Sequence, residues 1–311
     1  MRRELLVGVA LAFVACSSGT PTQTDTPDAG GTGKNKKYIH VTGNVQISPV
    51  ELAWRNAAHK PINGADILNG DTINVEDAIR ALSKLPPLNT GTLTSALTFD
   101  FAQVDVTNTT LALVASVKDK ADPTGPLFFS GYGLGKPPFP AEDVNLPVYT
   151  VTREFVQVLS KAIYGPDAAV LHNLENNTGG FVIGQAVYGA TKENPAGVGG
   201  IAGAQLNKVY GSGTAATMSP VISDPEHLLY YLNDDFTAAA PSTGKTSNSG
   251  VYVYVNAGGA QNYVMLKDGS VFEQHLSGSR DATALQVFFN QETGPTPTPA
   301  PDGGSGTDAG N

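Results

Sequence analysis

The fold class is decided by the stretch Phe181-Val182-Ile183-Gly184-Gln185-Ala186-Val187, which is rich in β-branched and aromatic residues and holds one internal glycine. Residues of these types favour strands, and a glycine inside a strand often marks a bulge or a close approach of another backbone. The stretch Ile39-His40-Val41-Thr42-Gly43-Asn44-Val45 has the same form. The sequence therefore predicts one strand of this kind in each half of the chain.

Each of these strands is followed by a segment with the pattern Ile-x-Gly-Ala-x-aliphatic. The two segments are Pro61-Ile62-Asn63-Gly64-Ala65-Asp66-Ile67 and Gly200-Ile201-Ala202-Gly203-Ala204-Gln205-Leu206. The internal glycines are 21 residues apart in the first half (43 to 64) and 19 in the second (184 to 203). We expect both segments to be strands, and the repetition predicts two domains of one fold.

The remaining pattern predicts more strands and two helices. Further strands are expected at 97–102, 104–106, 109–117, 230–232, 250–255, 263–266, 270–275 and 284–289. Helices are expected over 75–83, after an N-cap at Asn74, and over 153–164, before Gly165-Pro166. The predicted fold class is mainly β: two Ig-like or transthyretin-like β-sandwiches with one or two short helices, flanked by disordered tails.

The repeated pattern resembles the carboxypeptidase regulatory-like (transthyretin-like) β-sandwich. The second half carries the better match, in Gly184 to Val187, Gly203 to Leu206, Thr246 to Tyr252, and Tyr263. The first half departs from the family by an inserted helix. That family is a structural and binding module, so the resemblance implies no catalytic residues.

The N-terminus predicts export and a lipid anchor. Residues 5–15 are almost wholly apolar, and a membrane-spanning helix would need about 20 such residues. This run is typical of a signal peptide over 1–15. Phe13-Val14-Ala15-Cys16 resembles a bacterial lipobox, with Phe13 where an aliphatic residue is usual, and Cys16 is the only cysteine. We therefore expect acylated Cys16 to anchor the protein in the lipid bilayer.

Ser17 after the cysteine favours the outer membrane, at its periplasmic or surface face. The alternative is an ordinary signal peptide that is cut elsewhere, so that Cys16 is removed. A single cysteine excludes an internal disulfide in either case.

Composition defines the expected segments and excludes one class of partner. Residues 17–37 contain no large apolar residue, so 16–37 is expected to be a flexible tether, and 292–311 a disordered tail. The first sandwich is expected over 38–150, a connecting helix and linker over 151–177, and the second sandwich over 178–291. The full chain has a net charge of −9. Because acidic surfaces repel phosphate backbones, no nucleic-acid partner is expected.

Three polar stretches are candidate binding or catalytic sites. Residues 239–246 match a loose phosphate-loop pattern, but a strand follows instead of a helix, so an exposed turn is expected. From Asp66 to Asp77 the oxygen-bearing residues resemble a calcium loop, although the glycine is one position early. Calcium binding there stays open against a polar turn with a helix cap.

The third polar stretch is an acidic group with a nearby histidine. Asp224, Glu226, Asp234 and Asp235 could serve acid–base chemistry or bind a cation together with His227. Solvated turns are the favoured interpretation, with Asp234 and Asp235 after the strand at 230–232. No histidine has metal-ligand spacing, and no nucleophile motif is present, so we predict no catalytic residues, no metal and no cofactor.

Aromatic residues suggest where a ligand could bind. Tyr132 and Phe139, in the glycine- and proline-rich loop 131–140, are the ligand-facing candidates. The other aromatics could form a sugar- or peptide-binding face or pack in a core: Trp54, Phe128, Phe129, Tyr252 and Tyr254. The leading hypothesis is a non-enzymatic envelope module that binds an envelope protein or glycan. The alternatives are a carbohydrate-binding accessory lipoprotein and a hydrolase with an unrecognised site.

Overall fold

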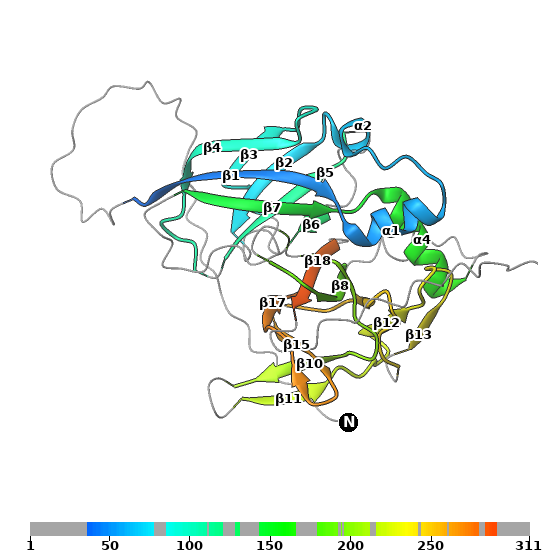
Figure 1. Ribbon diagram of the computed structural model, residues 1–311. Coiled ribbons are helices and arrows are strands. Elements are labelled where there is room, and N and C mark those ends of the chain that lie inside the picture. Colours follow the sequence, from blue (N-terminus) through cyan, green and yellow to red (C-terminus); the bar gives the residue numbers. More distant parts are fainter. Residues whose placement is uncertain are drawn as a thin grey trace, which may run out of the picture. The chain divides into compact units, whose positions relative to one another are not determined.

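The chain divides into two compact units, Met1–Asn35 and Lys36–Asn311, and every element described below belongs to the second. The computed structural model describes residues 36–77, 85–110, 112–120, 128–130, 143–165, 179–191, 194, 196–211, 216–241, 244–259, 261–279 and 284–290. The expected signal peptide, the tail and nearly all of the tether lie outside these residues. The described residues form a mainly β fold with three short helices (Figure 1), which confirms the predicted fold class.

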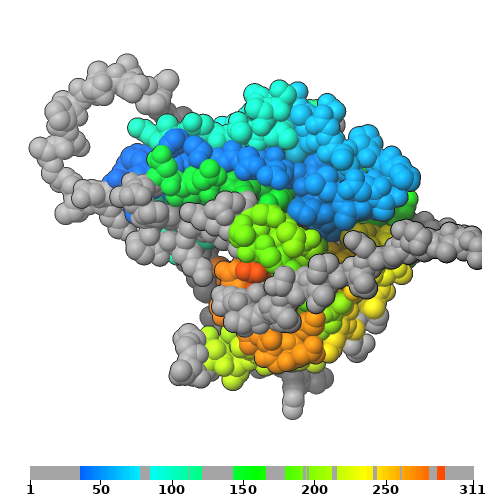
Figure 2. Space-filling model, viewed as in Figure 1, coloured from blue at the N-terminus to red at the C-terminus, as the bar shows by residue number. Residues whose placement is uncertain are grey.

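A three-stranded sheet has the order β4-β1-β7. Its strands are β1 (Tyr38–Ile47), β4 (Thr98–Asp105) and β7 (Val144–Thr150). β1 runs antiparallel to β4 and parallel to β7. In the space-filling view, the blue of β1 and the green of β7 run side by side across one face of this unit (Figure 2).

A ten-stranded sheet joins strands from early and late parts of the chain. Its order is β13-β12-β14-β8-β18-β6-β5-β2-β3, with β9 paired to β8. The bounds are β2 (Thr72–Asp77), β3 (Asn89–Thr92), β5 (Leu113–Lys118), β6 (Phe128–Ser130), β8 (Phe181–Tyr188), β9 (Gly199–Gly200), β12 (Leu228–Leu232), β13 (Ala239–Pro241), β14 (Val251–Val255) and β18 (Ala284–Asn290). This sheet takes strands from both predicted sandwich segments, whose boundaries stay a prediction.

A five-stranded sheet completes the β-structure, with the order β11-β10-β15-β16 and β17 paired to β15. Its bounds are β10 (Gln205–Tyr210), β11 (Thr217–Pro220), β15 (Gln261–Lys267), β16 (Ser270–Val271) and β17 (His275–Ser277). The strand expected at 270–275 is therefore two short strands.

The centre of the ten-stranded sheet is buried on both faces. On β8, Phe181, Ile183 and Val187 belong to a core cluster that includes Phe155 of α4 (Arg153–Tyr164). Val182 and Ala186, pointing the opposite way, belong to a second cluster with Tyr263 and Met265 of β15. A strand covered on both faces needs apolar residues at nearly every position. This explains why β8 is apolar at nearly every position, with Gln185 as the polar exception, and why β14 contains only valine and tyrosine.

The predicted helix over 153–164 is confirmed as α4. Thr152 caps its N-terminus, with its Oγ1 accepting a hydrogen bond from Phe155 N at 3.3 Å, and Gly165 ends it with φ +95°. No described helix is long and apolar enough to span a bilayer.

Two local predictions are wrong. The strand predicted at 61–67 is instead the short helix α2 (Gly64–Leu68), because Asn63 caps it, accepting a hydrogen bond from Ala65 N. In the second copy, at 200–206, Gly200 ends β9 and Gln205 begins β10, so residues 201–204 are not strand. The structural repeat is therefore limited to the glycine-bearing strands.

The helix predicted over 75–83 is also wrong at its start. Residues up to Asp77 belong to β2, which pairs with β5 along its whole length, and residues 78–84 lie outside the described ones. Ile73 and Val75 point into the core between β2 and the three-stranded sheet. Their burial outweighs the helix-start signals of Asn74 and the acids that follow.

The glycines in the two repeated strands are sites of close approach, by another backbone at Gly43, as the sequence predicts, and by an aromatic side chain at Gly184. A Cβ on Gly43 would lie 2.2 Å from the main-chain oxygen of Leu146 on β7 and 2.5 Å from the Phe99 ring. A Cβ on Gly184 would lie 2.0 Å from the Tyr252 ring on β14. Both contacts leave no room for a side chain.

Candidate functional site

A cavity of about 330 Å³ lies beside α1 (Pro49–Ala57), α2 and the start of α4. Its charged lining includes Arg55, Asp71, Asp119, Arg153 and Glu154, and its apolar lining includes Ile67, Leu68 and Val117. No sequence pattern pointed to this cavity. The candidate site is the ionic network at its wall.

The first element of the network is helix α1. Ser48 caps the helix, with its Oγ accepting from Val50 N at 3.3 Å, and Pro49 occupies the first turn, where a missing N–H costs nothing. Glu51 and Arg55 are one turn apart on the same face, and both are buried, at 0% and 4% exposure.

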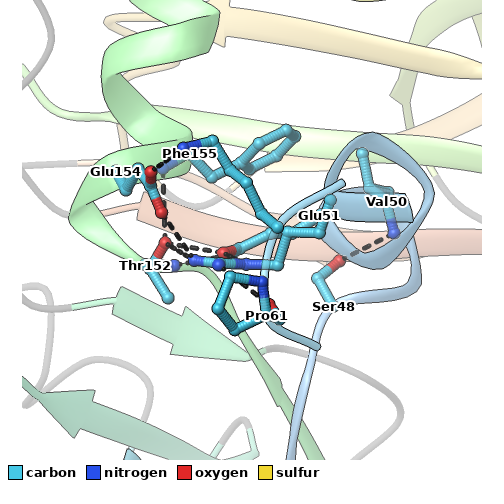
Figure 3. A network of polar contacts seen from close by, with 9 residues as sticks. Ser48, Val50, Glu51, Pro61, Thr152, Glu154 and Phe155 are labelled. Atoms are coloured by element: carbon cyan, nitrogen blue, oxygen red, sulfur yellow. Dashed lines mark hydrogen bonds and ion pairs between the residues drawn. The ribbon is translucent and has the colours of Figure 1, made fainter. Parts of the chain in front are cut away.

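Glu51 joins α1 to the cap of α4. Its Oε1 accepts hydrogen bonds from Arg55 Nε and from Thr152 Oγ1, both at 2.6 Å, and its Oε2 accepts from Thr152 N at 2.7 Å (Figure 3). Burial raises the pKa of Glu51, while the hydrogen bonds from Thr152 and Arg55 act in the opposite direction. The carboxyl is held by three donors on two elements.

Arg55 uses all three guanidinium nitrogens. Nε donates to Glu51, Nη1 donates to the main-chain oxygen of Pro61 at 3.1 Å, and Nη2 donates to Thr152 Oγ1 at 3.1 Å and to Glu154 Oε2 at 3.0 Å. A guanidinium fork of this kind holds several acceptors in fixed geometry. The cation therefore links α1, the chain before α2 and the first turn of α4.

Glu154 forms the exposed end of the network. Its Oε1 accepts from Lys60 Nζ at 2.7 Å, and this bond is the main reason why the pKa of Glu154 is lowered. Lys60 and Arg55 also lie beside the Trp54 ring, at 5.6 and 5.5 Å from its centroid. The network as a whole stabilises the packing of α1 on α4, and its groups are engaged with one another.

The calcium-loop residues do not converge. Asp66 lies on α2, where it accepts a hydrogen bond from Asn63 Nδ2, whereas Asp77 is buried on β2. Asp71, which lies between these two residues in the sequence, accepts a hydrogen bond from Lys120 N at 3.2 Å. Burial raises the pKa of Asp71. Within the described ranges, no group of three or more His, Cys, Asp or Glu side chains is arranged to hold a metal ion.

The acidic group with His227 separates into two turns. Asp224 Oδ1 accepts from the main-chain nitrogens of Glu226 and His227, both at 2.8 Å, and lies 3.0 Å from His227 Nδ1. Asp234 follows β12 and accepts from Ser249 N at 3.0 Å. The five residues of β12 put these turns roughly 16 Å apart. The predicted position of Asp234 and Asp235 after a strand is confirmed.

The phosphate-loop pattern has a structural role instead. Thr246 is buried, accepts a hydrogen bond from Ala204 N at 2.8 Å and donates to Ile201 O at 2.7 Å. The sequence predicts that a strand follows this segment, where a phosphate loop would need a helix. Strand β14 confirms that prediction.

The aromatic candidates have different outcomes. Tyr252 and Tyr254 are buried in the core, and Trp54 packs on Phe155, with ring centroids 5.6 Å apart. Phe128 and Phe129 lie on β6. Tyr132 and Phe139 lie outside the described residues, so the ligand-facing loop stays a prediction.

His40 bridges two carboxylates across the three-stranded sheet. It lies where the β1–β4 register shifts, with Nε2 2.8 Å from Asp100 Oδ1 and Nδ1 3.2 Å from Asp143 Oδ1. Hydrogen bonding to Asp100, foremost, raises the pKa of His40. Because the folded-state pKa is raised, the pairing stabilises the fold below the unfolded-state pKa, and this contribution is lost as pH rises through the folded-state pKa.

NMR titration of the imidazole should give His40 a pKa above the ordinary value of about 6.5. Asp100→Asn should lower the pKa of His40, because it removes the main partner of the charged ring. An unchanged titration of His40 in this variant would contradict the assignment.

Comparisons with known proteins give only distant structural matches. No family model matches the chain, and no curated protein matches it. The shaft pilin SpaA from Lactobacillus rhamnosus GG matches with 10% identity over 84% of this chain and 100% of that chain, at a TM-score of 0.21. The Bacillus anthracis TIE protein matches with 7% identity over 82% of this chain and 34% of that chain, at a TM-score of 0.18. At these TM-scores, the matches carry no conclusion about function.

Proposed function

We propose that this chain is an exported lipoprotein whose β-rich unit acts as a non-enzymatic binding or scaffold module at the cell envelope. The observation that carries the proposal is the N-terminal pattern: an apolar run over 5–15, Cys16 as the only cysteine, and a polar segment after it. Acylation explains an unpaired cysteine at this position, and two or more acyl chains anchor a protein stably.

The structure supports the proposal in two ways. The compact unit begins at Lys36, directly after the polar segment in the sequence, so residues 17–35 separate the proposed anchor from the folded unit along the chain. The buried ionisable side chains of Glu51 and Arg55 form hydrogen bonds that join α1 to α4. Asp224 and Asp234 accept hydrogen bonds from main-chain nitrogens in turns. These groups serve the fold, as a scaffold or binding module requires.

The anchor is tested at Cys16. We expect Cys16→Ser to abolish labelling by a palmitate analogue and to release the protein from the membrane fraction into the soluble fraction. Ser17→Ala, the neighbouring control, should keep both the label and the membrane association. Membrane retention of Cys16→Ser equal to that of the unaltered protein would contradict the anchor.

The binding role is tested by affinity capture of the full, lipidated protein from its own membranes. A protein recovered at constant ratio with this chain, and also recovered with the Cys16→Ser chain added to the same extract, supports an envelope partner of the β-rich unit. A carbohydrate-binding accessory role is the alternative, and it depends on Tyr132 and Phe139 in the loop 131–140. Glycan-array binding that Tyr132→Ala and Phe139→Ala both remove would favour this alternative.

A further inference from the structure

Two Asn-Gly pairs flank helix α2, at Asn63-Gly64 and Asn69-Gly70. After an asparagine, the next main-chain nitrogen can attack the side-chain amide carbon, and a glycine at that position offers the least steric resistance because it has no Cβ. Both pairs therefore have the local sequence for spontaneous deamidation. The two pairs differ in the hydrogen bonding of their glycine nitrogens.

At the first pair the reacting groups are accessible. Asn63 is exposed, and its Oδ1 accepts a hydrogen bond from Ala65 N at 3.1 Å, which polarises the amide carbonyl. Gly64 is the first residue of α2, where main-chain nitrogens have no acceptor within the helix. Among the described residues, no hydrogen bond is made by Gly64 N.

At the second pair the glycine nitrogen is held. Gly70 N donates to the main-chain oxygen of Leu93 at 2.8 Å, and Leu93 is buried. Gly70 has φ +91°, and Lys120 Nζ donates to the main-chain oxygen of Asn69. Attack by Gly70 N would first require this anchored turn to open.

We propose that Asn63 is a site of spontaneous deamidation in the folded protein, and that Asn69 is protected. Gly64 N loses its proton to solvent hydroxide and forms a bond to Cγ of Asn63. The bond from Cγ to Nδ2 then breaks, and the departing nitrogen takes a proton from water and leaves as ammonia. Water then opens the resulting five-membered imide at either carbonyl and gives aspartate or isoaspartate. No oxidant or reductant takes part.

Deamidation at Asn63 would alter helix α2, which forms part of the cavity wall. Aspartate at 63 still accepts from Ala65 N, but it loses the Nδ2 donor to Asp66 Oδ2 at 2.9 Å and places two carboxylates side by side. Isoaspartate inserts a methylene into the main chain and disrupts the cap of α2. Ile67 and Leu68 of α2 line the cavity, so loss of the cap loosens that wall.

The test is to incubate the full chain under folding conditions at mildly alkaline pH and to follow both sites by peptide mass spectrometry with isoaspartate-specific methylation. We expect Asn63 to deamidate roughly tenfold faster than Asn69, the factor expected for breaking one main-chain hydrogen bond. Gly64→Ala should slow the reaction at 63 without affecting 69. A Cβ there would meet only the end of the Leu97 side chain, at 3.1 Å.

The urea-unfolded chain provides the matched control, because both pairs then share the same local chemistry. Similar rates at 63 and 69 in urea, together with faster deamidation at 63 than at 69 in the folded protein, support the proposal. Equal rates in the folded protein, faster reaction at Asn69, or no reaction at Asn63 would overturn it.

Discussion

Replacing Glu51 with alanine is expected to lower the free energy of unfolding by about 3–5 kcal/mol. The change removes the carboxylate that accepts from Arg55 Nε and from both Thr152 donors. It leaves the Arg55 charge buried at 4% exposure, with the partly exposed Glu154 as its remaining carboxylate partner. Urea unfolding measured by far-ultraviolet circular dichroism should give a lower midpoint with an unchanged slope.

The control for this prediction is Glu154→Ala, which removes a carboxylate that is 45% exposed in the same network. It should cost less than about 1 kcal/mol, because exposed ion pairs are screened by water. The double change Glu51→Met with Arg55→Met should cost less than Glu51→Ala alone, since no buried charge is left without its partner. Equal losses for Glu51→Ala and Glu154→Ala would contradict the role assigned to the buried pair.

The second large effect is expected at the glycines of the repeated strands. Gly43→Ala should destabilise the protein by about 3 kcal/mol, because the new Cβ would lie 2.2 Å from a main-chain oxygen of β7 and could be accommodated only by separating β1 from β7. Gly184→Ala should cost a similar amount, since its Cβ would overlap the buried Tyr252 ring.

Gly199→Ala is the matched control, because Gly199 is an exposed strand residue with no atom within 4 Å of the added Cβ. Thermal unfolding of the three variants should therefore give two large decreases in Tm and one near zero. Wild-type stability in Gly43→Ala would show that β1 and β7 are not packed as closely as described.

The sequence predicted the elements whose local pattern agrees with their packing. The nearly continuous apolar sequences of β8 and β14 and the helical spacing of α4 are direct consequences of burial, and all three elements lie where the sequence predicts them. The local pattern of residues 61–67 is compatible with either a strand or a short capped helix. The hydrogen bond to the Asn63 cap favours the helix. At β2, pairing with β5 outweighed local helix signals.

The candidate site could not be predicted in the same way. Glu51 and Arg55 have helical spacing, but their partner Thr152 is 101 residues from Glu51 in the chain. A contact across that separation exists only once α1 packs on α4. The one local clue was an acid and a base four residues apart on a short amphipathic segment, a pattern typical of exposed helix faces.

The ten-stranded sheet can be completed only after strand β18 has formed. It pairs in parallel with both β8 and β6, so it is the element that joins the late strands of the sheet to the early ones. Until residues 284–290 have been synthesised and have crossed any membrane in their path, β6 and β8 each present an unpaired edge. Exposed edges promote aggregation of nascent chains. Productive folding of this protein therefore depends on keeping those edges apart from other chains until the last strand arrives.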